Sequence, residues 1–271
     1  MAAVCVDDAS IDFEGLSVEK VHLIGRQLDA ASRCGVGTLR HRLGAEKIDS
    51  LFKRATKLLK NEPTVVDLNF TDPTARVTVV GDTHGQLHDV LHMFEVAGNP
   101  GESMTFIFNG DFVDRGSWGL ETLILFVCWK LTYPTKVYLI RGNHESQLMT
   151  QMYGFREEIE VKYSKQSRMI YASSKRLFAA MPLAAVIQQQ TLVCHGGLFR
   201  ATGRKRKKGK GKRELQLGTM TTLRGCSKGG LEPTAPKVAQ AVSDVLWSDP
   251  VPENGMVENE SRGLGLVFGD R

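Results

Sequence analysis

The sequence predicts an α/β fold, because short apolar runs typical of buried strands alternate with helix-length segments. Four of these runs lead directly into Gly-rich polar turns: 76–80 into GDTHG, 104–108 into NGDFVDRG, 136–140 into RGNHE, and 191–194 into HGG. The composition, with 42% hydrophobic and 24% charged residues, is ordinary for a soluble globular protein. We therefore expect a substantial core around strands that end in polar loops.

Residues 1–70 predict a helical N-terminal extension. An apolar stripe at helical spacing precedes the NEP sequence and consists of Ile48, Leu51, Phe52, Ala55, Leu58 and Leu59. A less regular helix is predicted over 18–31. Neither segment groups reactive side chains, so we assign the chemistry to a domain at 71–271.

Helix-length segments follow the first three predicted strands, at about 86–97, 118–131 and 151–163. This repetition of strand, turn and helix is the pattern of α/β units. In open α/β sheets the loops at the C-terminal ends of the strands converge, and ligands bind there. The four polar turns are therefore expected to meet at one place.

The positive charge of the chain is concentrated in one segment. The formal net charge is +5, but the run RKRKKGKGKR at Arg204–Arg213 carries eight positive charges, so the remainder is net negative. The run lies in a Gly-rich insertion predicted at about 201–236. Because the charge is local and lacks neighbouring aromatic residues, the sequence disfavours nucleic acid as a partner.

Four interpretations of Arg204–Arg213 stay open: a solvated loop, a nuclear-import signal, a nucleic-acid contact or a calmodulin target. The run lacks the apolar helix face that calmodulin grips, so a nuclear import receptor is the favoured partner. No apolar run approaches the length of a membrane span, and the N-terminus lacks the pattern of a secretory signal. We expect the protein in the nucleus, the cytoplasm or both, without a membrane.

Side chains able to bind metals or phosphate gather at the four turns: Asp82, His84, Asp111, Asp114, Arg115, Asn143, His144 and His195. Carboxylates, imidazoles and an amide oxygen form a mixed set that suits manganese, iron or zinc better than calcium. Metal ions would also relieve the repulsion between carboxylates held close together. This many ligands fit two metals better than one.

Each motif alone has a simpler interpretation. GDTHG can be a tight turn whose Asp caps the next helix, and GDFVDRG can be a turn with a surface Asp–Arg pair. GNHE alone is more often a loop, and HGG is a weak signal. Four such loops in this order, each at a strand end, are hard to obtain by chance, which favours the metal site.

The series GDTHG, GDFVDRG, GNHE, HGG, LWSDP and RGLGLVFG resembles the serine/threonine phosphoprotein phosphatase family, which has the calcineurin-like metallophosphoesterase fold. The resemblance runs from about Val77 to the last residue. The sequence SDVLWSDP and the lysine-rich insert after HGGL are most similar to the plant protein phosphatase 7 branch. The resemblance implies a sandwich of two mixed β-sheets flanked by helices, and a hydrolase that acts on phosphoserine and phosphothreonine in phosphoproteins.

The resemblance also assigns metal ligands. It implies that Asp82 and His84 bind a first metal, that Asp111 bridges both metals, and that Asn143 and His195 bind the second. A hydroxide between the metals would attack the phosphorus, since metal coordination lowers the pKa of water. Two divalent ions are expected, with manganese favoured and iron or zinc as alternatives.

The remaining roles concern the phosphate and the leaving group. The resemblance implies that Arg115 and Arg262 hold the phosphoryl oxygens through their guanidinium groups. It further implies that His144 protonates the departing serine or threonine oxygen and that Asp114 orients it. The resemblance to the plant branch also favours a calmodulin-binding insert and a location in the nucleus.

Family members continue beyond the FGDR sequence at Arg271 with a helix, a strand that supplies another histidine ligand, and further strands. We therefore expect a fold with its C-terminal strands missing, an uncovered sheet edge, and a second metal with three protein ligands. The alternative to an enzyme is a truncated pseudophosphatase that acts as a non-catalytic binding or regulatory protein.

Overall fold

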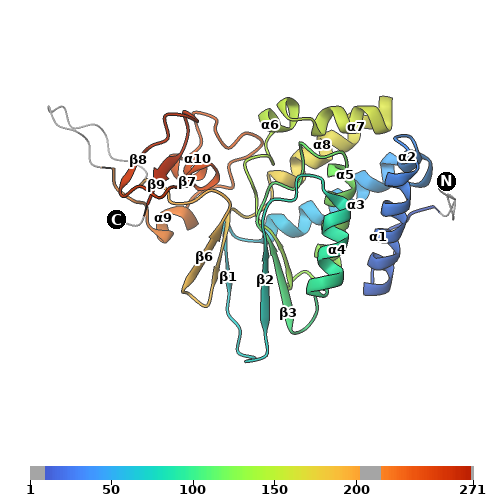
Figure 1. The fold of residues 1–271 in the computed structure, drawn as a ribbon, viewed down its shortest axis with the longest axis horizontal. Coiled ribbons are helices and arrows are strands. Elements are labelled where there is room, and N and C mark those ends of the chain that lie inside the picture. Colours follow the sequence, from blue (N-terminus) through green and yellow to red (C-terminus); the bar gives the residue numbers. More distant parts are fainter. Residues whose placement is uncertain (1–9, 202–214, 270–271) are drawn as a thin grey trace.

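The computed structural model describes residues 10–201 and 215–269. Within these ranges three small sheets stand in a row, with most helices on the side that contains the N-terminus (Figure 1). The basic run at Arg204–Arg213 lies outside the described residues, so its partners and its role in localisation stay predictions. No helix in the described ranges has both the length and the apolar character needed to cross a bilayer.

The N-terminal region contains three helices, α1 (Val18–Arg33), α2 (Thr38–Arg42) and α3 (Ala45–Asn61). The Ser17 side chain caps α1 by accepting a hydrogen bond from the Lys20 backbone N–H at 3.3 Å. The apolar faces of α1 and α3 bury residues in the largest hydrophobic core of the described chain, together with residues of the later helices.

The central parallel sheet follows the prediction. It contains β2 (Arg76–Val80), β3 (Met104–Phe108) and β4 (Val137–Leu139), in that order. The connections contain α4 (Leu87–Ala97) and α5 (Gly119–Thr132). Every residue from Gly119 to Lys130 is buried, which explains why α5 is apolar on almost all sides rather than striped.

One predicted helix, 151–163, is wrong in its boundaries. The structure has α6 (Gln147–Met152) and α7 (Phe155–Tyr163), separated at Gly154, whose φ is 116°. A backbone in this region favours glycine and interrupts the helical hydrogen-bond pattern. A short 3₁₀ turn (Ser164–Gln166) then leads into α8 (Ser167–Phe178), which the sequence did not predict.

A second, mixed sheet has the order β1 (Val65–Leu68), β5 (Ala184–Ile187) and β6 (Thr191–Cys194). β1 lies inside the span expected to be a helical extension, yet it pairs in parallel with β5. Side chains of this sheet and of the β2–β3–β4 sheet share an apolar cluster that includes Leu68 and Ile107. The two sheets therefore pack face to face, and the helices of the largest core cover the outer side of the β2–β3–β4 sheet (Figure 1).

The C-terminal part of the described chain consists of short helices and strands. It contains α9 (Met220–Arg224) and α10 (Gln240–Trp247), followed by a three-stranded mixed sheet. The strands of that sheet are β7 (Asp249–Pro250), β8 (Met256–Glu258) and β9 (Leu266–Phe268), in the order β7–β9–β8.

Candidate active site

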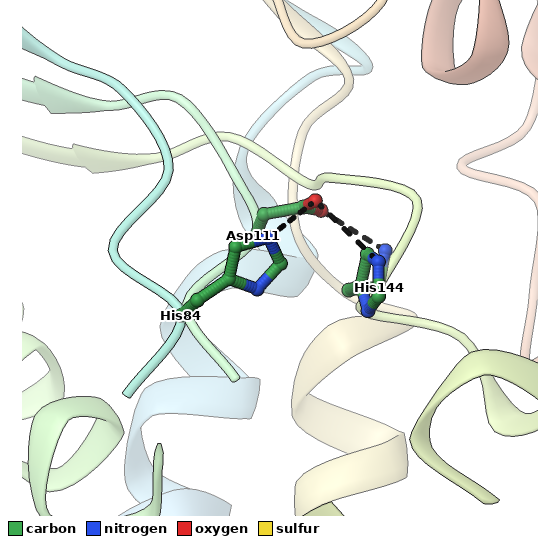
Figure 2. Close-up of side chains that lie close together, drawn as sticks. All are labelled: His84, Asp111 and His144. Carbon is green, nitrogen blue, oxygen red and sulfur yellow. Dashed lines mark hydrogen bonds and ion pairs between the residues drawn. The ribbon is translucent and has the colours of Figure 1, made fainter. Parts of the chain in front are cut away.

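Polar side chains from four strand ends meet at one place. His84 follows β2, Asp111 follows β3 and His144 follows β4, and Figure 2 shows these three side chains turned toward one another. His195, directly after β6, joins them, since its Nε2 lies 3.3 Å from Asp111 Oδ1. The predicted convergence of the four loops is confirmed.

Asp111 lies at the centre of this cluster. Its Oδ1 faces His195, whereas its Oδ2 lies 3.5 Å from His84 Nε2 and 3.9 Å from His144 Nε2. The residue is only 3% exposed. The two oxygens of one buried carboxylate therefore face two different sets of ligand atoms, which is the arrangement that a carboxylate shared by two metal ions requires.

Backbone carbonyls fix the tautomers of two histidines. His84 Nδ1 lies 2.8 Å from the Val113 carbonyl oxygen, and His195 Nδ1 lies 2.8 Å from the Asn109 carbonyl oxygen. A carbonyl oxygen only accepts, so each Nδ1 carries a hydrogen, and only Nε2, which faces Asp111, is left to bind a metal ion. A hydrogen bond of this kind to the distal ring nitrogen is the usual support of a metal-binding histidine.

Asp82 completes the set from a more open position. Its side chain is 55% exposed, and its oxygens lie 3.8 Å from His84 Nε2 and 3.8 Å from His195 Nδ1. Bonds to metals such as zinc are about 2.0–2.2 Å long, so donor atoms around one ion are roughly 3–4 Å apart. The separations in this cluster lie in that range.

By proximity the ligand atoms form two groups that share Asp111. One contains His84 and His144 with Asp111, and the other contains Asp82 and His195 with Asp111. This partition differs from the one that the motifs imply, which pairs Asp82 with His84. Asp111 belongs to both groups in either partition.

Asn143 provides an independent test of whether a cation fits. The residue is 9% exposed, and its side-chain oxygen is buried without a hydrogen-bond donor from any described residue. A buried carbonyl oxygen without a partner is costly, and a metal ion would satisfy it. Together with the mixed imidazole and carboxylate set, this oxygen shows that the residues fit a divalent metal.

The electrostatics of the cluster also suit a cation. Burial alone would lower the pKa of His195, but the hydrogen bond and negative charge of Asp111 outweigh it and raise the pKa to about 9. Burial alone would raise the pKa of Asp111, but the hydrogen bond from His195 and the charges of His195 and His144 leave it lowered. The fold thus favours a positive charge beside an ionised Asp111.

Glu145 holds two of these loops together, a role that the sequence did not reveal. Its buried carboxylate accepts backbone N–H groups of Asp111 at 2.8 Å, Phe112 at 2.8 Å and Gly142 at 2.9 Å. Burial and the charge of Asp111 raise the pKa of Glu145 to about 7. The only signal in the sequence is a carboxylate directly after Asn143 and His144, within the GNHE motif.

The loops are strained and closely packed. Left-handed backbone angles occur at His84, Asp111, Asp114 and Arg115, with φ between 37° and 69°. Non-glycine residues rarely adopt these angles, and they persist where the surroundings fix them, often at functional sites. A Cβ on Gly142 would overlap the backbone nitrogen of Asp111, so only glycine permits this approach of the two loops.

His144 and Asp114 form a buried pair beside the metal ligands. His144 Nδ1 lies 2.7 Å from Asp114 Oδ2, and Asp114 Oδ1 accepts the Phe155 backbone N–H at 2.9 Å, at the start of α7. Burial alone would lower the pKa of His144, but the hydrogen bond to Asp114 and the charges of Asp111 and Asp114 leave it raised. The pair leaves Nε2 of His144 directed at the cluster.

The two arginines assigned to the phosphate differ in position. The backbone N–H of Arg115 donates to the Tyr153 carbonyl oxygen at 3.0 Å, and its guanidinium lies 5.8 Å from the Tyr153 ring centroid. Tyr153 also stacks edge to face on His144, with centroids 5.0 Å apart, so Arg115 borders the cluster. Arg262 lies between β8 and β9, where its guanidinium binds Asp249 and faces the Trp247 ring.

A model of the calcineurin-like phosphoesterase family matches residues 75–265. The chain belongs to the calcineurin-like phosphoesterase family. The resemblance drawn from the motifs is confirmed, and the α/β architecture of helices around two central sheets agrees with it. The residues matched include all nine side chains to which the motifs assign a role.

Relatives of this calcineurin-like phosphoesterase include curated phosphatases. It is 39% identical over 233 residues to Serine/threonine-protein phosphatase 7 of Arabidopsis thaliana, a match that covers 82% of the chain and 56% of that protein. It is 37% identical over 213 residues to human Serine/threonine-protein phosphatase 5, covering 79% of the chain and 38% of that protein. The chain spans 18% to 56% of the length of its first curated relatives.

The fold also matches a solved structure. A protein serine/threonine phosphatase from Saccharomyces cerevisiae, described as similar to human phosphatase PP5, aligns with a TM-score of 0.69 and 35% sequence identity. The alignment covers 84% of this chain and 65% of that structure. The described part of the chain therefore has the fold of a protein phosphatase over most of its length.

Proposed function

We propose that this chain hydrolyses phosphoserine and phosphothreonine in proteins. The observation that carries the proposal is Asp111, a buried carboxylate whose two oxygens face separate sets of ligand atoms, with the His144–Asp114 pair alongside. The relatives named serine/threonine-protein phosphatase support the substrate class. The convergence of Asp82, His84 and His195 around Asp111 favours an enzyme over the non-catalytic alternative.

We propose Asp82, His84 and Asp111 as ligands of one divalent ion and Asp111, Asn143 and His195 as ligands of the other. When bound, such ions polarise phosphoryl oxygens and lower the pKa of water so that it can attack near neutral pH. The mixed nitrogen and oxygen set suits manganese, with iron or zinc as alternatives. The chain holds His84 in place through the carbonyl of Val113 and His195 through the carbonyl of Asn109.

His144 is proposed to protonate the departing oxygen of the substrate. Asp114 holds Nδ1, so the proton to be transferred sits on Nε2, which faces Asp111 at 3.9 Å. A fixed imidazole whose tautomer is set by a buried carboxylate is the usual design of a general acid. For this reason we leave His144 out of the metal-ligand set, although it lies near His84.

Arg115 and Arg262 are proposed to bind the phosphoryl oxygens. Arg115 follows the strained Asp114 and lies beside Tyr153, which contacts His144. Arg262 uses Nε and Nη2 for Asp249 and keeps Nη1 for the substrate. A guanidinium can bind a carboxylate on one edge and a phosphate on the other, which lysine cannot do.

Release of inorganic phosphate from a phosphoserine peptide tests the proposal. With manganese added, we expect turnover that stops after chelation and returns when manganese is restored. A phosphotyrosine peptide of the same sequence is the matched control and should react more slowly. Absence of phosphate release from either peptide and from p-nitrophenyl phosphate, at any manganese concentration, would contradict the proposal.

A further inference from the structure

A basic cleft lies between α3 and α8, away from the strand-end cluster. The two helices run side by side in parallel, and near their first turns Gln166 donates to Glu46 at 3.2 Å. Toward their C-terminal ends they enclose a cleft of about 330 Å³. Three lysines of α3 and one arginine of α8 line it: Lys53, Lys57, Lys60 and Arg176. None of the proposed metal ligands lines this cleft.

The sequence of α3 places these lysines together. Lys53, Lys57 and Lys60 are spaced by four and three residues, so they occupy one stripe beside the buried apolar face of the helix. All three are exposed, and the Arg176 side chain is 55% exposed. Like charges at these spacings destabilise a helix, so the arrangement costs stability unless an anion offsets it.

The cleft has too few carboxylates for its cations. Asp49 is the partner of two of them, since its oxygens lie 2.6 Å from Lys53 Nζ and 4.0 Å from Arg176 Nη2. Across residues 10–201 and 215–269, the side chains of Lys57 and Lys60 make no hydrogen bond or ion pair. Four cations therefore share one carboxylate.

Favourable interaction with the helix C-termini does not fully account for the positive charge of this cleft. Cations near a helix C-terminus interact favourably with the helix dipole and with the last carbonyl groups. Here Lys228 already fills that role, because its Nζ donates to the Leu59 carbonyl oxygen at 2.7 Å and to the Ala180 carbonyl oxygen at 2.8 Å. The exposed lysines of the cleft reach none of these carbonyls.

We propose that this cleft binds a small polyanion that carries phosphate groups. Each lysine offers an ammonium with three donors, Arg176 offers a planar fork, and both groups form strong hydrogen bonds with phosphate oxygens. The volume falls within the range of about 300–1,000 Å³ that is usual for small-ligand pockets. The ligand would supply the negative charge that Asp49 alone cannot, and its binding does not depend on turnover at the Asp111 cluster.

Inositol hexakisphosphate, titrated into the manganese-loaded full chain by calorimetry at physiological salt, is the probe. The test variant is Lys57→Gln/Lys60→Gln, which removes two cations of the cleft. The matched control is Lys165→Gln/Arg168→Gln, which removes two exposed cations near the other end of α8. Arg204–Arg213 and the metal cluster are identical in both variants, so their own affinity for polyanions cancels in the comparison.

We expect the cleft variant to weaken binding by about tenfold or more, since hydrogen bonds to charged groups are the strong ones. The control variant should stay within about threefold, because exposed charges at a distance are screened by salt. The variant Lys57→Arg/Lys60→Arg should retain the affinity and would show that the loss is not a folding defect. Equal losses in the cleft and control variants, or no loss in either, would overturn the proposal.

A second arm identifies the source of the phosphate groups. Vesicles of phosphatidylcholine with phosphatidylinositol bisphosphate are sedimented with the wild-type chain and with Lys57→Gln/Lys60→Gln. If the wild-type chain sediments with the vesicles and the double variant does not, the cleft binds a lipid headgroup. If the wild-type chain binds inositol hexakisphosphate but not the vesicles, the cleft binds a free polyphosphate.

Discussion

The fold holds two groups of proposed site residues in different ways. The ligands around Asp111 are held by buried backbone contacts: carbonyls orient His84 and His195, and Glu145 binds three N–H groups of the loops. The guanidinium of Arg262, in contrast, is held by the Trp247 ring and by an ion pair with Asp249 in which the two side chains are 45% and 35% exposed.

This difference shows which functions the fold prepares in advance. Metal binding needs donor atoms within tenths of an ångström, and buried hydrogen bonds on rigid strand ends supply that accuracy. A guanidinium on an exposed ion pair is positioned more loosely, because such pairs contribute about 0–1 kcal/mol. We therefore expect substitutions around Asp111 to change metal content and chemistry, and substitutions at Arg262 to change mainly substrate affinity.

The largest effect is expected for Asp111→Asn. An amide can still bind one metal weakly through its oxygen, but it cannot serve two ions as a carboxylate does. Metal affinity should fall by more than about 100-fold, beyond the 10–100-fold that loss of an outer-shell partner costs. Metal content after dialysis measures this, with Asp89→Asn on the surface of α4 as the control for lost charge. Full metal content in Asp111→Asn would rule out the shared-ligand assignment.

His144→Asn should separate chemistry from metal binding. Loss of a general acid costs about 10²–10⁴-fold in rate, whereas the metal content should stay near that of the wild type. The comparison variant is His92→Asn, an exposed imidazole whose removal should leave kcat unchanged. If His144→Asn lost metal as completely as Asp111→Asn, His144 would be a ligand rather than the proton donor.

Glu145→Gln tests whether the loops are set before metal binds. The amide nitrogen of Gln would meet a backbone N–H in place of an accepting oxygen, which costs about 1–3 kcal/mol of unfolding free energy. Metal affinity should fall by about 10–100-fold, although Glu145 is not a ligand. Denaturant unfolding and metal titration report these two quantities, and Glu95→Gln on the surface is the control. Unchanged values for both would mean that the loops hold their shape without Glu145.

The smallest effect on stability is expected at Arg262. Arg262→Lys should change the unfolding free energy by less than about 1 kcal/mol, because the pair with Asp249 is half exposed. KM for a phosphopeptide should rise by about tenfold, since lysine cannot bind Asp249 and a phosphate in the same way. Arg224→Lys, in a similar surface pair with Asp67, is the control. Equal KM values for the two variants would remove Arg262 from the substrate site.

The sequence predicted the strand-end cluster because its signals are local. Each ligand lies within a few residues of an apolar run that ends at a Gly-rich turn, so the place of Asp111 or His195 depends on its own strand. The convergence of the loops then follows from the way parallel strands align at one edge. The spacing of the motifs along the chain indicates the remaining features of the cluster.

Tertiary contacts decide what the sequence could not predict. Glu145 binds N–H groups of a loop more than thirty residues earlier in the chain, and no local pattern announces such a contact. The break between α6 and α7 depends on the backbone angle of Gly154, which a glycine permits but does not dictate. The basic cleft depends on α8, a helix whose packing on α3 brings Arg176 to the lysines.

Anomalous X-ray scattering from crystals grown with manganese tests whether Asp111 serves two metal ions, because it locates the ions without reference to activity. We predict two peaks, about 3.5–4 Å apart, both within bonding distance of the Asp111 carboxylate. One peak should also contact Asp82 and His84, and the other should contact Asn143 and His195. A single peak, or two peaks that do not share Asp111, would show that this carboxylate is not a shared ligand.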